Sequence, residues 1–148
     1  MREADGWEAL AIGTEAGRVE IAVTDAVIDD YLETMELDCP FFLRPTPPFA
    51  ARIAPPDMVP KLAMAALSEA FCNRVVGPNI RAKQAFRFFA PVFAGTLVRA
   101  TSRVVEKYER RNRRFVTLEA LFIDGAGRKL ALDRRTQMVL GVDFAMKR

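Results

Sequence analysis

The segment that most restricts the fold is Lys61–Phe71, KLAMAALSEAF, in which apolar residues surround nearly the whole circumference of a helix. One side of this predicted helix carries Leu62, Ala63, Ala66, Leu67, Ala70 and Phe71. Met64 and Ala65 extend the apolar surface further around it. A helix that is apolar on all sides is usually buried by other elements. The rest of the chain must therefore supply a layer that encloses it.

The second half of the chain predicts the strands of such a layer. Residues alternate between polar and apolar with the two-residue period of a half-buried strand. The predicted strands are Ile80–Val92, Thr96–Arg110, Phe115–Ile123 and Lys129–Val142. Pro91 should either end the first of these strands or place it at the edge of the sheet. The Asp124-Gly125 pair is a hairpin signal, and we expect a meander of about four strands.

The first half adds one strand and one amphipathic helix. Arg18–Thr24 alternates in the same way, and Thr24 stands where the side-chain cap of a helix should be. The helix predicted over Asp25–Leu37 places apolar residues at helical spacing. Strands that curl around one buried helix form an α+β fold. We expect a single domain over residues 1–148, with its core at about 18–142. An uncovered sheet edge favours at least a dimer.

Composition excludes several classes of protein. With 51% hydrophobic and 28% charged residues in 148, the chain is globular rather than disordered. It has no histidine, two cysteines and no CxxC pair, so we expect no metal site, no cofactor and two buried reduced thiols. No signal peptide or run of about 18 apolar residues is apparent. We therefore expect a cytoplasmic protein that does not cross a membrane.

A proline-rich stretch lies directly before the apolar helix. Arg44–Pro60, RPTPPFAARIAPPDMVP, contains six of the nine prolines of the chain. Each proline fixes a φ angle and removes a backbone donor. The stretch is interpreted as the rigid lip of a tunnel or of a dimer seam, and the alternative is a plain linker.

Two segments together resemble the hotdog-fold proteins of the MaoC-like hydratase and fatty-acid-synthase-type dehydratase family. The first is Leu37–Leu62, LDCPFFLRPTPPFAARIAPPDMVPKL, and the second is Gln84–Leu130, which begins QAFRFFAPVFAGTLVRA. The resemblance spans about residues 18–140 and depends on the order and spacing of both segments. It implies an antiparallel sheet wrapped around a central helix, and a ligand that is an acyl-CoA or acyl-carrier-protein thioester.

The resemblance also implies catalytic groups, and the sequence departs from them twice. Active family members use an Asp and a His on a water molecule, with backbone N–H groups at the central helix polarising the thioester carbonyl. Asp38 matches the Asp, but the His position falls near Phe42–Arg44 in a chain without histidine. Pro56 takes the place of a glycine and has no N–H to donate, and Asp57 follows at the same helix mouth. This pattern is similar to the non-catalytic halves and accessory subunits of the family.

The resemblance therefore predicts a non-catalytic or partner-dependent subunit of an enoyl-thioester hydratase or dehydratase. We expect it to form a homodimer, or a heterodimer with a second hotdog subunit. Asp38 and Asp57 are the candidate catalytic carboxylates, with Asp57 also the expected cap of the central helix. The candidate substrate-binding residues are Arg44, Ile53, Ala54, Pro55, Pro56, Met58, Phe88, Arg111 and Arg113.

Two other functions stay open at this stage. One is an autonomous dehydratase or thioesterase whose base is Asp38, Asp57 or Glu69, since burial can raise a carboxyl pKa towards neutrality. The other concerns the basic stretch Lys107–Phe115 at a predicted hairpin tip. Three interpretations of this stretch are open: a solvated hairpin end, a phosphate contact for coenzyme A or a carrier protein, and a nucleic-acid surface. Nucleic acid is the least favoured because few aromatics accompany the charges.

Overall fold

The computed structural model describes residues 6–140 of the chain. Its strands are β1 (Glu15–Val23), β2 (Asn79–Phe88), β3 (Thr96–Arg110), β4 (Arg113–Ile123) and β5 (Lys129–Val139). Its helical segments are α1 (Gly6–Ala9), α2 (Asp25–Thr34), α3 (Pro40–Leu43), α4 (Met58–Leu62), the π-helical η1 (Ala65–Glu69) and α5 (Ala70–Val75). The predicted end of the last strand, at 141–142, lies outside the described residues.

The strands form one antiparallel sheet in the order β1-β3-β4-β5-β2. The predicted four-strand meander is wrong in one respect, because only β3, β4 and β5 pair consecutively. The segment after β2 contains Pro91, which has no N–H for a ladder, so the chain leaves β2 in a loop instead of a tight hairpin. β2 pairs with β5 at one edge, and β1 pairs with β3 at the other.

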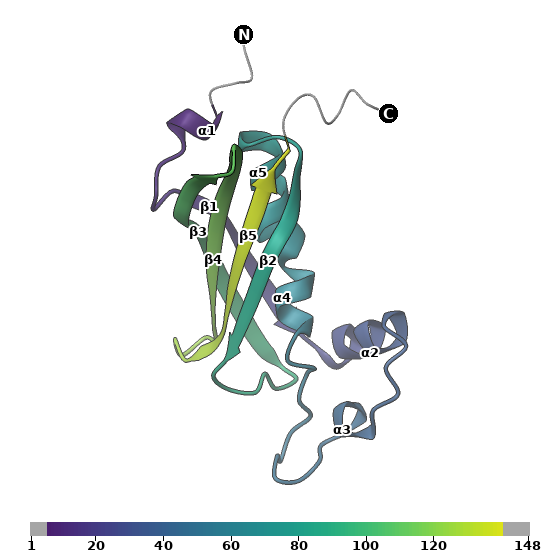
Figure 1. Ribbon diagram of the computed structural model, residues 1–148. Helices are drawn as coiled ribbons and strands as arrows, with labels where there is room; N and C mark the ends of the chain where they lie inside the picture. The colour runs from purple at the N-terminus through teal and green to yellow at the C-terminus, as the bar shows by residue number, and fades with distance from the viewer. Residues whose placement is uncertain (1–5, 141–148) are drawn as a thin grey trace.

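Helices α4, η1 and α5 follow one another and lie across one face of the curved sheet (Figure 1). The expected α+β arrangement of a sheet around an apolar helix is therefore confirmed. Buried side chains from this helical stretch include Met58, Leu67 and Phe71. They pack on inward residues of the sheet in two apolar clusters. At Gly17 of β1 the approach is so close that a Cβ atom would lie 2.2 Å from the carbonyl oxygen of Ala66.

The sheet does not enclose the helix completely, and this corrects the expectation of an apolar surface buried on all sides. Leu62, Ala66 and Ala70 belong to the predicted buried face but are exposed. The wider π-helical turn of η1 contributes to this difference at Ala70, since it shifts the phase of the residues that follow it. One side of the central helix consequently presents apolar side chains to solvent.

Helix α2 begins as predicted. The Thr24 side-chain oxygen accepts a hydrogen bond from the N–H of Val27 at 3.2 Å, which caps the first turn. Together α2, α3 and the proline-rich stretch project from the end of the sheet near the N-terminus of α4 (Figure 1). Among residues 6–140, no helix is long and apolar enough to cross a membrane.

Candidate functional site

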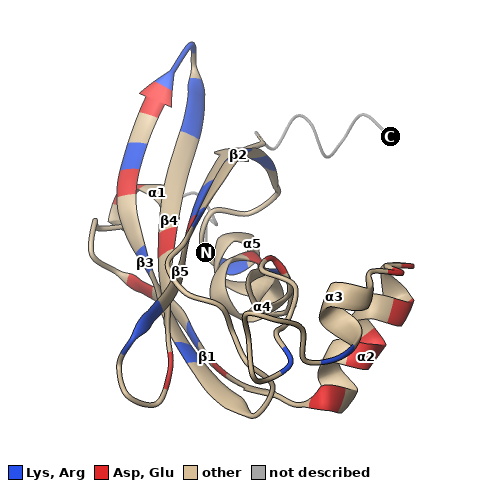
Figure 2. Cartoon of the chain, turned by 90° about the horizontal axis from the view of Figure 1, so that it is seen from below, with Lys and Arg blue, Asp and Glu red and all other residues tan. Residues whose placement is uncertain are grey.

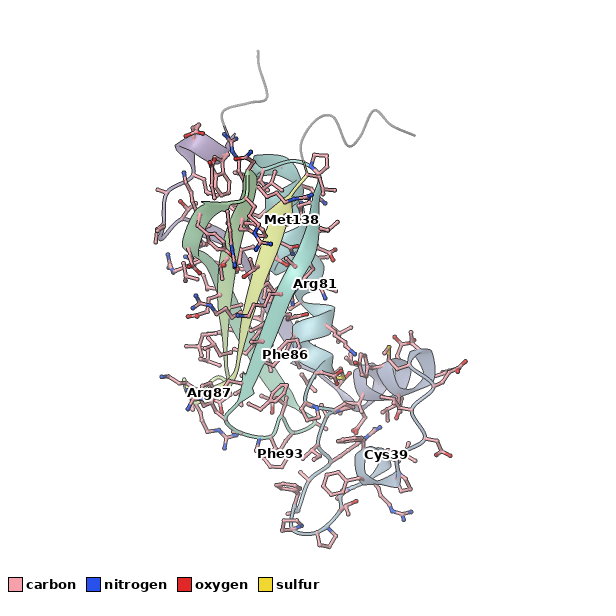
Figure 3. All side chains as sticks on the ribbon, in the orientation of Figure 1. Cys39, Arg81, Phe86, Arg87, Phe93 and Met138 are labelled. Carbon is pink, nitrogen blue, oxygen red and sulfur yellow. The ribbon has the colours of Figure 1, made fainter. Side chains whose placement is uncertain are left out.

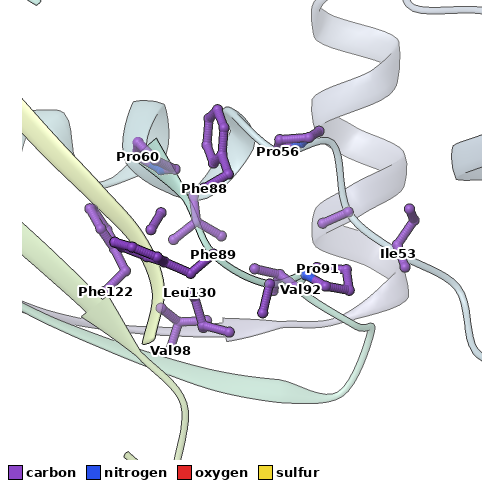
Figure 4. Close-up of a pocket in the computed structure, with 14 residues that line it drawn as sticks. Ile53, Pro56, Pro60, Phe88, Phe89, Pro91, Val92, Val98, Phe122 and Leu130 are labelled. Carbon is purple, nitrogen blue, oxygen red and sulfur yellow. The ribbon is translucent and has the colours of Figure 1, made fainter. Parts of the chain in front are cut away.

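An apolar cavity of about 320 Å³ lies between the start of α4, the loop after β2 and the inner face of the sheet (Figure 4). All its lining residues are apolar: Ile53, Ala54, Pro56, Val59, Pro60, Phe88, Phe89, Ala90, Pro91, Val92, Val98, Phe122, Leu130 and Ala131. The volume falls at the lower end of the range for small-molecule sites. Such a lining suits a hydrocarbon group and offers no side chain for proton transfer.

The N-terminus of the central helix borders this cavity with few free backbone donors. Pro55, Pro56 and Pro60 have no N–H group. The N–H of Ala54 donates to the carbonyl of Val92 at 2.8 Å, and the N–H of Met58 donates to the carbonyl of Pro55 at 3.0 Å. An oxyanion site needs unpaired donors that point at the reacting oxygen. Five of the seven residues 54–60 cannot supply one in this conformation.

Asp57 occupies the predicted cap position of α4, but its side chain makes no cap hydrogen bond. Its Oδ2 instead pairs with Lys61 Nζ at 2.6 Å, one helical turn later. The hydroxyl of buried Tyr31 lies beside this pair. It makes no hydrogen bond of acceptable geometry to any of the described residues. Burial raises the pKa of the Tyr31 phenol, and this outweighs the opposing effect of Lys61. The phenol therefore stays protonated at neutral pH.

Arg52 fixes the proline-rich stretch to the rest of the chain. Its side chain is only 8% exposed, and it pairs with Asp29 at 2.6 Å and with Asp25 at 3.1 Å. Its Nε donates to the carbonyl of Phe42 in α3 at 2.6 Å. Burial disfavours the charged guanidinium, but Asp29 and Asp25 outweigh this and raise the pKa of Arg52. A buried cation thus holds the stretch against α2 and α3, which a plain linker would not require; its role as a lip stays a prediction.

Aromatic side chains connect the same stretch to the cavity loop. The ring of Phe49 lies 6.2 Å from that of Phe41 in α3 and 5.9 Å from that of Phe93, both edge-on. Ile53 and Phe93 form an isolated antiparallel bridge. Figure 3 shows Phe86, Arg87 and Phe93 at this end of the sheet, with Met138 at the other. The lip therefore packs directly on the loop that lines the cavity.

The structure brings some of the predicted site residues together. Ile53, Ala54, Pro56 and Phe88 line the cavity. Pro55 and Met58 are buried beside it but do not line it.

The candidate carboxylates and Arg44 lie elsewhere. Arg44 is exposed at the end of α3. Asp38 borders a shallow groove between α2 and α3 together with Leu37 and Leu43, and it does not line the cavity. Glu69 is exposed on the central helix.

The predicted phosphate contacts Arg111 and Arg113 lie at the tip of the β3–β4 hairpin. Arg111 and Asn112 adopt positive φ values there, as a tight hairpin turn requires. Val98 of the same strand lines the cavity, so the tip is about 40 Å away along the strand. Figure 2 shows basic residues at this tip and acidic residues along α2, at opposite ends of the molecule. One chain therefore does not bring these arginines to the cavity.

The two cysteines differ in their surroundings. Both are free thiols, Cys72 buried and Cys39 only half-buried, so the expectation of two buried thiols holds for one of them. Burial raises the pKa of the Cys72 thiol to about 11. Within residues 6–140, no three acidic or cysteine side chains converge as metal ligands would.

Arg52 and the loop Phe89–Val92 were missed as site residues by the sequence patterns. The sequence predicts a strand over Ile80–Val92 that runs through this loop, whereas β2 ends at Phe88, and Arg52 contacts partners 10 to 27 positions away. The proline-rich composition of Arg44–Pro60 was the usable signal for Arg52, and Pro91 was the usable signal for the loop.

No protein-family model matches the sequence, and no curated protein sequence is similar enough to count as a relative. Solved structures do match. The (R)-hydratase PhaJ1 from Pseudomonas aeruginosa superposes with a TM-score of 0.70 at 22% identity, over 90% of this chain and 84% of that one. The HadBC (3R)-hydroxyacyl-ACP dehydratase complex from Mycobacterium tuberculosis gives a TM-score of 0.71 at 21% identity, over 86% of this chain and 96% of that one.

A MaoC-like dehydratase from Rhodospirillum rubrum gives a TM-score of 0.70 at 18% identity, over 90% of this chain and 94% of that one. Identities this low establish a common fold and do not by themselves transfer an activity. The expectation that came from the two sequence segments is thus confirmed for the architecture: the chain has the hotdog fold of MaoC-like dehydratases and (R)-hydratases.

Proposed function

We propose that this chain is an acyl-thioester-binding hotdog protein that serves as a non-catalytic or partner-dependent subunit of an enoyl-CoA or enoyl-carrier hydratase (dehydratase). The observation that carries the proposal is the cavity of about 320 Å³ at the mouth of the central helix, lined only by apolar residues. Such a cavity accommodates the hydrocarbon part of an acyl group.

Addition of water to an enoyl thioester needs a group that moves a proton and donors that stabilise the enolate-like oxygen. Histidine is the side chain best suited to the first task near neutral pH, and this chain has none. For the second task, prolines and engaged N–H groups occupy most of residues 54–60. Both considerations favour binding without autonomous chemistry.

A partner subunit fits the surroundings of the cavity. The cavity lies beside the edge strand β2, and Phe88 at the end of this strand and Phe89 directly after it are 47% and 43% exposed. An edge strand with exposed aromatic side chains is a natural pairing surface for another sheet. The HadBC neighbour is itself a complex, which supports a second hotdog subunit as the partner. Such a partner would cover the two phenylalanines and supply the Asp and His that this chain does not provide.

The autonomous carboxylate enzyme is less well supported. Asp38 borders a separate groove, Asp57 pairs with Lys61, and Glu69 is exposed on the central helix. A carboxylate that acts as a base near pH 7 needs burial beside its substrate. None of the three lines the cavity.

The test is to assay hydration of crotonyl-CoA by the purified chain alone, and then after co-expression with an Asp/His-bearing hotdog subunit. The proposal expects a stable complex and activity only with the partner. Full turnover by a homomeric preparation would refute it. In that case, alanine variants of Asp38, Asp57 and Glu69 would identify the base.

A further inference from the structure

We propose that the buried pair Asp133–Arg135 closes the inner end of the apolar cavity and sets the longest hydrocarbon chain that the cavity accepts. The identity of the ligand as an acyl thioester rests on the proposed function. The limit on chain length rests on the geometry of β5, its neighbour β2 and the central helix.

The pair is fully buried and satisfied by hydrogen bonds. The side chains of Arg135 and Asp133 are 4% and 3% exposed. Arg135 Nε donates to Asp133 Oδ2 at 2.7 Å, and its Nη2 also contacts the same carboxylate oxygen. The other carboxylate oxygen accepts from Gln84 of β2 at 3.1 Å. A charge buried this deeply is tolerated because it is paired and bonded on several sides.

The same guanidinium also holds the central helix. Arg135 Nη1 donates to Ser68 Oγ in η1 at 3.0 Å, and Nη2 donates to the carbonyl of Pro60 in α4 at 3.3 Å. Ser68 Oγ in turn donates to the carbonyl of Met64 at 3.0 Å. Pro60 is one of the residues that line the cavity. Arg135 therefore connects β5 to a wall of the cavity and to the π-helical turn.

The pair stands directly beyond the cavity along the inner face of the sheet. Ala131 of β5 lines the cavity, and Asp133 is the next residue on the same face, about 7 Å further along the strand. The ladder places Phe88 opposite Ala131 and Phe86 opposite Asp133. The rings of Phe86 and Phe88 stack at 5.8 Å. A hydrocarbon chain that extends past Ala131 along this face would meet the ion pair.

A hydrocarbon end cannot advance into this region without separating hydrogen bonds that have no replacement. Leaving one member of a buried pair unpartnered is strongly unfavourable, whereas replacing both by apolar residues of similar size is often tolerated. The pair therefore acts as a stop, and its removal should let longer chains enter.

The experiment compares wild type with the double variant Asp133→Leu/Arg135→Met. Binding is measured for a series of saturated straight-chain acyl-CoAs and for the matching straight-chain primary alcohols. In the wild type, affinity should rise with chain length and then stop rising. In the double variant the rise should continue, so that a chain two methylenes beyond the wild-type limit binds about tenfold tighter than it does to wild type.

The control is Thr117→Val/Thr136→Val, which replaces another buried polar pair of the same sheet, bonded at 2.9 Å on the opposite face. Its length limit should equal that of wild type. If the double variant does not fold, Ser68→Ala decides the question, because it removes one hydrogen bond of Arg135. The affinity for a chain two methylenes beyond the wild-type limit should then rise about twofold. An unchanged limit in the folded variant overturns the inference. If the alcohols show the predicted chain-length limit but no acyl-CoA binds, the proposed function is refuted and the inference about the limit stands.

Discussion

Replacing Arg52 by alanine should detach the proline-rich stretch from α2 and α3. The guanidinium makes a hydrogen bond to the Phe42 carbonyl at 2.6 Å, and bonds to charged groups contribute about 1.5–3 kcal/mol each. Asp25 and Asp29 are largely exposed, so each of their ion pairs adds no more than about 1 kcal/mol. We expect a total loss of about 2–4 kcal/mol in the free energy of unfolding.

Urea denaturation and thermal unfolding measure this loss directly. For a domain of this size it corresponds to a fall in Tm of roughly 4–16 °C. Arg52→Lys keeps the charge but lacks the planar fork, so it should lie between wild type and Arg52→Ala. Arg44→Ala, an exposed arginine of the same stretch, is the matched control and should change stability by less than about 0.5 kcal/mol.

An Arg52→Ala variant within about 0.5 kcal/mol of wild type would refute the reasoning, because it would mean that the buried contacts of Arg52 contribute nothing net. Limited proteolysis adds a local measurement. In the variant, cleavage within 44–51 should become faster, since the segment loses its connection to α2.

Three further predictions test other parts of the account. Ala131→Phe fills the cavity and should weaken acyl-CoA binding at least tenfold while the protein stays folded, because the added ring takes the place of the ligand. Iodoacetamide should label Cys39 in the native protein and leave Cys72 unmodified, since the Cys72 thiol is buried with a pKa of about 11; labelling of both thiols, read by mass spectrometry, would contradict its burial. The backbone N–H of Arg128 is the main cause that lowers the pKa of Asp124, outweighing burial. Asp124→Asn should therefore reduce Tm at pH 7, and the difference from wild type should vanish as the pH falls from about 4 through the folded-state pKa; a difference that persists there would contradict this assignment.

Features that depend on neighbouring residues were predictable from the sequence. Thr24 caps α2, Asp124-Gly125 opens the β4–β5 turn, and strand β3 has the predicted bounds Thr96–Arg110. Each follows from periodicity, capping or turn chemistry within a few positions. The resemblance of two segments then supplied the hotdog architecture.

Features that depend on distant parts of the chain were not predictable. The position of β2 beside β5 is set by pairing across the whole sheet, so a consecutive meander was the wrong expectation. Exposure of Leu62 depends on how far the sheet curls, and this leaves no mark in the residue pattern. The inward positions of Asp133 and Arg135 could have been derived by continuing the alternation from Ala131, but a buried ion pair is too rare to be assumed.

The most direct test of the central claim is to titrate the purified chain with a trans-2-enoyl-CoA and to analyse the bound ligand in the same sample. The account predicts saturable binding that Ala131→Phe weakens at least tenfold, with the ligand recovered unchanged. Recovery of the 3-hydroxyacyl product from the isolated chain would contradict it, because the chain would then carry its own acid–base chemistry.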